Sequence, residues 1–88
     1  MFYKMKCYIY FLFSQSKRKF YVGISNDVND RLIRHNSSQS LSTKFGVPWK
    51  LLHVIECENK SAAMLLETKI KKRGISRYLF DNNISTGL

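Results

Sequence analysis

Cysteine is scarce in this chain of 88 residues, which has only Cys7 and Cys57. The two stand far apart in apolar runs and form no CxxC pair, so the sequence offers neither a disulfide framework nor a zinc-binding motif. We therefore expect both to be small buried thiols, with a reducing cytoplasm as the default compartment.

Long hydrophobic runs are also missing. The apolar run at residues 7–13 is far shorter than the roughly 20 residues that a membrane-spanning helix needs. The polar and basic stretch at 14–19 follows it, where a signal peptide would have a small-residue cleavage site. We therefore expect no membrane partner and no signal peptide.

Acidic residues are few, because 6 Asp plus Glu face 15 Lys plus Arg, for a formal net charge of +9. Such an excess of positive charge on a small chain indicates a polyanionic partner, and nucleic acid is the first candidate. A small basic structural protein is the alternative that charge alone leaves open. With 44% hydrophobic residues and no internal repeat or linker, we expect residues 1–88 to form one domain with a core at about 7–82.

Three aromatic and β-branched runs predict strands. Residues 7–13 are apolar on both alternate faces, as in a strand that is covered on two sides. A short basic connection leads to a second strand at 20–24, so these two strands should form an antiparallel hairpin. After a Ser-, Thr- and Gly-containing loop at 36–47, Pro48 precedes a third strand at 49–57.

Helical spacing follows the second and third strands. Asn26 or Asp27 should cap a first helix that runs to Asn36. Ser61 should cap a second helix over 62–73, which Gly74 closes. Its expected apolar stripe is Ala62, Ala63, Leu66 and Ile70, with Met64 beside it.

A third short helix is expected at residues 76–82, where Tyr78, Leu79 and Phe80 should pack. The resulting order is β-β-α-β-α-α. It predicts an α+β fold in which helices flank a small three-stranded antiparallel sheet.

Three polar side chains fall on faces that should pack. On the first helix, Arg31 and His35 lie along the edge of the apolar stripe. On the second helix, Glu67 lies inside the stripe, where a lone buried charge is costly unless it is paired or binds a metal. A surface ion pair with Lys71, four residues further on, is the simpler explanation of Glu67.

The run Tyr8-Ile9-Tyr10 and the later run Tyr21-Val22-Gly23 together resemble the paired motif of the GIY-YIG nuclease family. The resemblance extends over residues 8–79 and continues with Arg31, His35-Asn36, Pro48-Trp49-Lys50-Leu51 and Glu67. The chain looks most like small stand-alone members, which are similar to the catalytic domain of excision-repair incision nucleases. It departs from the motif at Tyr8, where the family has glycine.

The resemblance implies an active site with one divalent metal ion. The catalytic residues carried over are Tyr10, Tyr21, Arg31, His35 and Glu67, and Glu67 would bind one Mg²⁺ or Mn²⁺ ion. Arg31 would hold a phosphate oxygen, and either Tyr10 or His35 would be the general base. Without the family, the tyrosines are ordinary strand aromatics and His35 is a helix-end residue favoured by the helix dipole.

Basic residues in the hairpin and near the end of the second helix should contact the nucleic-acid backbone. Asn82 is included because many family members carry an asparagine beyond the glutamate. The predicted nucleic-acid-binding residues are Lys17, Arg18, Lys19, Arg31, Lys44, Lys71, Lys72, Arg73 and Asn82. Such contacts do not read bases and weaken with salt, whereas a merely solvated positive face is the alternative.

The predicted function is a metal-dependent endonuclease that hydrolyses DNA phosphodiester bonds with little intrinsic sequence specificity. DNA is the expected partner, and a targeting protein is a second one, because we expect no sequence-specific cutting by this chain alone. One alternative is a non-catalytic nucleic-acid-binding module with the same fold. Another is a structural protein of a ribonucleoprotein, whose RNA binding would depend neither on Mg²⁺ nor on Glu67.

Overall fold

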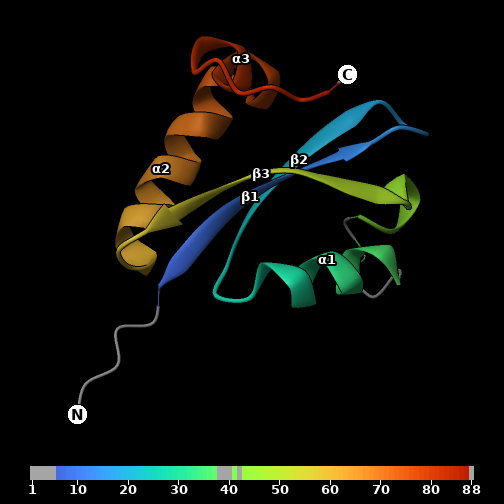
Figure 1. Cartoon of the computed structure of the whole chain (residues 1–88), viewed down its shortest axis with the longest axis horizontal. Helices are drawn as coiled ribbons and strands as arrows, with labels where there is room; N and C mark the ends of the chain where they lie inside the picture. Colours follow the sequence, from blue (N-terminus) through green and yellow to red (C-terminus); the bar gives the residue numbers. More distant parts are fainter. Residues whose placement is uncertain (1–5, 38–40, 42, 88) are drawn as a thin grey trace.

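The computed structural model describes residues 6–37, 41 and 43–87, in which three strands form one sheet with helices packed against it (Figure 1). The strands are β1 (Cys7–Ser14), β2 (Lys19–Ser25) and β3 (Trp49–Cys57). The helices are α1 (Val28–Asn36), the 3-10 helix η1 (Lys44–Gly46), α2 (Lys60–Arg73) and α3 (Ile75–Asp81). This order confirms the predicted α+β fold. Within the predicted loop at 36–47, η1 is an addition, and residues 38–40 and 42 lie outside the described residues.

β1 is the central strand of the sheet. The strand order is β2-β1-β3, and both pairings are antiparallel. The hairpin between β1 and β2 is therefore confirmed. Residues 9–14 are all buried, which also confirms that β1 is covered on two sides.

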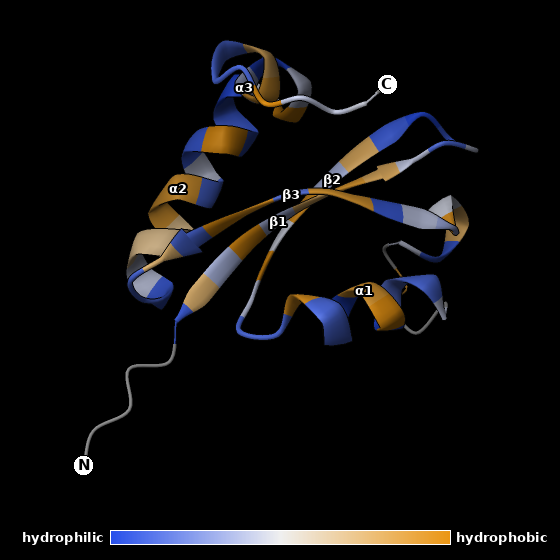
Figure 2. Cartoon of the chain, viewed as in Figure 1, coloured by the Kyte–Doolittle hydropathy of each residue, from blue (hydrophilic) through white to orange (hydrophobic). Residues whose placement is uncertain are grey.

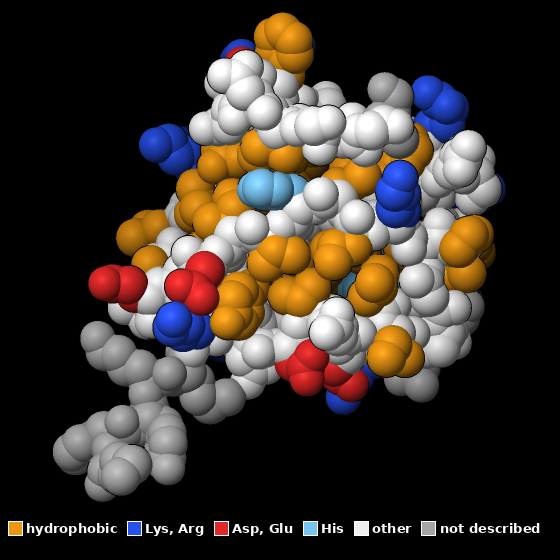
Figure 3. Space-filling view, in the orientation of Figure 1, with side chains coloured by type: hydrophobic (Ala, Val, Ile, Leu, Met, Phe, Trp, Pro, Cys, Tyr) orange, Lys and Arg blue, Asp and Glu red, His pale blue; other side chains and the backbone are white. Residues whose placement is uncertain are grey.

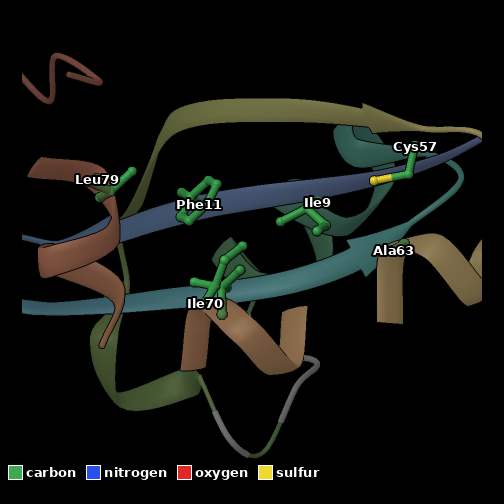
Figure 4. Close-up of a cluster of buried hydrophobic side chains, with 7 residues drawn as sticks. Ile9, Phe11, Cys57, Ala63, Ile70 and Leu79 are labelled. Atoms are coloured by element: carbon green, nitrogen blue, oxygen red, sulfur yellow. The ribbon is translucent and has the colours of Figure 1, made fainter. Parts of the chain in front are cut away.

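The two faces of β1 lead to two separate cores. Ile9 and Phe11 point to one face, where the core also contains Val22, Cys57, Ala63, Ile70 and Leu79 (Figure 4). Tyr10 and Leu12 point to the other face and pack with Trp49 and the apolar residues of α1. Burial of one large apolar side chain contributes roughly 1.5–3 kcal/mol, so this alternation fixes α1 and α2 on opposite faces of the sheet (Figures 1 and 2).

The helix ends follow the predicted capping chemistry with one correction. Asp27 caps α1 as predicted, because its carboxylate accepts from the backbone N–H of Asp30 at 3.0 Å. The prediction of Ser61 as the cap of α2 is wrong, since Asn59 accepts from the N–H of Ala62 at 2.8 Å and the helix starts two residues earlier. Gly74 closes α2 as predicted, with a φ of 97° that suits glycine.

Several residues expected to pack are exposed instead. Ala62 and Met64 face solvent, so the buried stripe of α2 narrows to Ala63 and Ile70 with Leu66 partly buried. In α3, Leu79 is buried but Phe80 is 83% exposed, because successive helical residues point about 100° apart. Other hydrophobic side chains also reach the surface, and several of them adjoin one another in Figure 3.

The two cysteines are free and stand opposite each other in the pairing of β1 with β3. Cys57 is buried as predicted, whereas Cys7 at the start of β1 is only partly buried. None of the described helices combines the length and the apolar character that crossing a bilayer requires.

Candidate active site

Tyr10 and His35 meet on the face of the sheet that α1 covers. Tyr10 comes from the middle of β1, and His35 is the buried residue of α1. The phenol oxygen Oη lies 2.9 Å from Nε2 of His35 in a hydrogen bond. Only 1% of Tyr10 and 3% of His35 are exposed, so water does not compete for this bond.

Gly23 makes room for Tyr10. The two residues are partners in the pairing of β1 with β2. A Cβ atom on Gly23 would lie 2.5 Å from Oη and 2.6 Å from Cζ of Tyr10, which is closer than real Cβ contacts come. The glycine of Tyr21-Val22-Gly23 is therefore needed for the tyrosine of the first motif to lie across β2.

Thr43 and Trp49 hold the other side of the imidazole. Thr43 is 1% exposed, and its Oγ1 is hydrogen-bonded to Nδ1 of His35 at 2.7 Å. The indole Nε1–H of Trp49 donates to the carbonyl of Thr43 at 2.7 Å. Asn36 donates to the carbonyl of Trp49 and accepts from its N–H, so the start of β3 is tied to the end of α1.

Tyr21 completes an aromatic group around the imidazole. Its ring lies 5.0 Å from that of His35 in an edge-on arrangement and 6.1 Å from the ring of Tyr10. The ring of Trp49 lies 6.1 Å from that of Tyr21. Tyr21 is partly exposed, so it connects the buried pair to the surface.

Burial sets the protonation states of the pair. The pKa of Tyr10 is raised first by burial and then by Tyr21, while the guanidinium of Arg31 acts in the opposite direction. The pKa of His35 is lowered from 6.5, again first by burial and then by the charge of Arg31. At pH 7 the phenol therefore keeps its proton and the imidazole is neutral. Arg31 itself is exposed, yet its charge acts on both groups.

The sequence matches the family model of the GIY-YIG catalytic domain over residues 6–78. The chain belongs to the GIY-YIG family. The match confirms the resemblance carried by the tyrosine motifs, and it indicates nuclease-type activity for this chain. Searches of curated proteins and of solved structures returned no significant match.

Glu67, the metal-binding residue that the resemblance implies, lies on α2, whereas Tyr10 and Tyr21 lie on β1 and β2. Its side chain is 22% exposed on α2, which packs on the face opposite to α1. Lys71 approaches its carboxylate at 3.7 Å, which is the ion pair that the sequence offered as the simpler explanation. Among the described residues, no group of three or more His, Cys, Asp or Glu gathers around a common point.

A cavity of about 430 Å³ lies beside the hairpin and Tyr21. Lys17, Arg18 and Lys19 are exposed in and next to the turn that joins β1 to β2. Two of them, Lys17 and Lys19, line the cavity together with Tyr21 and Trp49. This group of cations therefore lies next to the aromatic residues around His35.

The second basic group lies near the end of α2 and is partly paired. Arg73 donates two hydrogen bonds to Asp81, at 2.6 and 3.2 Å, and this contact lowers the pKa of the Asp81 carboxyl. Lys71 is paired with Glu67, whereas Lys72 is exposed. The side chain of Asn82 donates to the carbonyl of Tyr78 at 2.8 Å, so it takes part in closing α3.

Sequence reasoning missed three residues that build this site. The sequence placed Gly23 and Trp49 only within motif segments and Thr43 only within a loop, with no contact predicted for any of them. The pairing of Gly23 with Tyr10 could have been found by aligning the two strands of the predicted hairpin. Thr43 had no signal, because its contact depends on how the loop returns to α1.

Proposed function

We propose that this GIY-YIG domain is a divalent-metal-dependent endonuclease that hydrolyses DNA phosphodiester bonds with little intrinsic sequence preference. The observation that carries the proposal is the buried hydrogen bond between Tyr10 and His35, with the charge of Arg31 beside it. Hydrolysis of a phosphodiester needs an acceptor for the proton of water and positive charge for the phosphoryl oxygens. These three side chains supply both.

His35 is the final proton acceptor in this proposal. Its lowered pKa keeps the ring neutral at pH 7, so that one ring nitrogen carries a proton and the other accepts one. With Thr43 accepting from Nδ1–H, Nε2 is left to accept the proton of Tyr10. Thr43 is thus a positioning residue, which sets the tautomer that the reaction requires.

Tyr21 is the group that meets the attacking water. Tyr10 is 1% exposed, whereas Tyr21 lines the cavity and influences the pKa of Tyr10. A proton therefore passes from water to Tyr21, from Tyr21 to Tyr10, and from Tyr10 to Nε2 of His35, which becomes imidazolium. The hydroxide so formed attacks phosphorus, the bond to the leaving ester oxygen breaks, and that oxygen takes up a proton from solvent water, while His35 later returns its extra proton to solvent.

Arg31 binds the phosphate that reacts. Its guanidinium is exposed and permanently charged, and its planar donors match the oxygens of a phosphate. Substrate bound there would bring its phosphorus close to the tyrosines, because the same charge acts on Tyr10 and His35.

Glu67 is the residue that would hold the metal ion. Mg²⁺ takes one or two carboxylates and completes its shell with water and substrate phosphate, so a cluster of acids is not required. Glu67 fits this chemistry, since its carboxylate is partly exposed and its ion-pair partner Lys71 lies as far as 3.7 Å away. When bound, the ion would supply positive charge to a phosphoryl group.

The test is nicking of supercoiled plasmid with Mg²⁺, with Mn²⁺ and with EDTA. Glu67→Gln should abolish nicking, and Arg31→Ala should slow it about 100-fold or more, as expected when a preorganised charge is removed. Glu58→Gln is the matched control, because Glu58 is an exposed acid outside the proposed site. Nicking that persists in EDTA, or in Glu67→Gln, would refute the metal-dependent mechanism.

A non-catalytic nucleic-acid-binding module remains the second candidate. The observation that favours it is the ion pair of Glu67 with Lys71, on the face opposite to the tyrosines. This candidate predicts DNA binding that weakens with salt, with no nicking in either metal. RNA binding that is indifferent to Mg²⁺ and to Glu67→Gln would point instead to a ribonucleoprotein component.

A further inference from the structure

An exposed aromatic residue borders the cavity beside Tyr21. Phe45 of η1 is 70% exposed, and it lines the cavity of about 430 Å³ together with Tyr21 and Trp49. The cavity lies between the start of β2 and the segment that carries η1 into β3. Neither of the two cores includes Phe45, so packing does not explain an aromatic residue here.

Lysines lie near this aromatic residue. Nζ of Lys44 lies 5.1 Å from the centre of the Phe45 ring, and Lys17 and Lys19 line the same cavity. The lining residues include no carboxylate. An aromatic face among lysines is the combination that binds single-stranded nucleic acid, where bases stack on rings and cations hold the backbone.

A fully paired duplex cannot use such a site, because its bases already stack on one another. A base has to be unpaired before one of its faces can lie against Phe45. The volume of the cavity falls within the roughly 300–1,000 Å³ of typical small-molecule sites, which makes it a suitable place for a single nucleotide.

The cavity shares Tyr21 with the candidate active site. Tyr21 is part of its wall, and the ring of Tyr21 lies 5.0 Å from that of His35. A nucleotide seated in the cavity would therefore be a close neighbour of the phosphate that reacts.

We propose that the cavity binds an unpaired nucleotide next to the cleavage point, with its base stacked on Phe45 and its phosphates held by Lys17 and Lys19. The proposal rests on the proposed nuclease function and names its substrate class. The substrate is DNA with single-stranded character at the cut, such as a flap, a bubble or a frayed end. Recognition is independent of sequence, because every base offers a face for stacking.

Binding in EDTA tests this proposal without cleavage. The probes are a flap DNA and a fully paired duplex of the same length, with 2-aminopurine at the junction and at the matching duplex position. Wild type should bind the flap more tightly than the duplex and quench 2-aminopurine in the flap. Phe45→Ala should weaken flap binding about fivefold or more, which is the lower end of what base–aromatic stacking contributes, and should leave duplex binding unchanged.

Two further variants separate the loss of base stacking from a nonspecific effect of removing an exposed phenylalanine. Phe45→Tyr keeps a ring and should retain the flap preference. Phe80→Ala removes another exposed phenylalanine, which lies on α3, and should change neither flap nor duplex binding. Equal affinity of wild type for flap and duplex, or an unchanged preference in Phe45→Ala, would overturn the proposal while leaving metal-dependent nicking intact. The reverse result, a flap preference without nicking in Mg²⁺ or Mn²⁺, would overturn the nuclease function instead.

Discussion

Replacing Gly23 by alanine should damage the site from within the sheet. The added Cβ would lie 2.5 Å from Oη and 2.6 Å from Cζ of Tyr10, and 3.0 Å from its Cε1. These atoms belong to a buried ring that is hydrogen-bonded to His35, so the ring cannot move aside without breaking that bond. Either the backbone of β2 shifts, or the ring of Tyr10 moves and its hydrogen bond to His35 breaks.

The two costs give the size of the effect. Overpacking of a buried position costs about 1–3 kcal/mol. Separation of a buried hydrogen-bonded pair costs about 1–3 kcal/mol more, because both polar groups lose their partner away from water. We therefore expect Gly23→Ala to lower the free energy of unfolding by about 1–3 kcal/mol if only β2 shifts, and by up to about 6 kcal/mol if the hydrogen bond of Tyr10 is lost as well. Either loss is a large fraction of the stability of a small domain.

Urea unfolding followed by fluorescence measures this loss. The chain has one tryptophan, Trp49, which is buried beside the site and reports on it directly. In the background of Tyr10→Ala, which removes the ring, Gly23→Ala should cost little, so a double-mutant cycle isolates the overlap. Equal urea midpoints for wild type and Gly23→Ala would refute the close packing of Tyr10 against β2.

Three further predictions concern the pH dependence that His35 gives to stability, the core that contains Ile70, and the N-terminal cap of α2. Because the folded state lowers the pKa of His35 below 6.5, the free energy of unfolding should fall as pH drops below that value, and His35→Gln should flatten this dependence in urea titrations at several pH values. Ile70→Ala should cost about 2–5 kcal/mol on thermal or urea unfolding, whereas Phe80→Ala should stay within about 0.5 kcal/mol. Asn59→Ala should destabilise by about 1 kcal/mol and Ser61→Ala by much less, and the opposite order would contradict the cap assigned to α2.

The fold was predictable because its signals are local. The apolar residues on both faces of residues 7–13 identified a central strand, and a short connection identified the hairpin. The cap of α2 was missed because Asn59 and Ser61 are both good caps, and the choice depends on where β3 ends. Phe80 was misplaced because a helix of two turns gives no periodicity to separate it from Leu79.

The candidate site was predictable only where a motif marked it. Tyr10, Tyr21 and His35 come together as the family motif suggested, whereas Thr43 and Phe45 come from a segment with no periodic pattern. Their roles depend on the path of the chain between α1 and β3, which tertiary packing decides.

The most direct test of the account is the nicking rate of Tyr10→Phe. This variant keeps the ring and removes only the hydroxyl that connects Tyr21 to His35 in the proposed proton path. Loss of a positioned acid or base costs about 10²–10⁴ in rate, so single-turnover nicking of plasmid with Mg²⁺ should slow by at least about 100-fold. Affinity for DNA in EDTA should stay at the wild-type value. Nicking by Tyr10→Phe at the wild-type rate would contradict the proton path, whatever the variant binds.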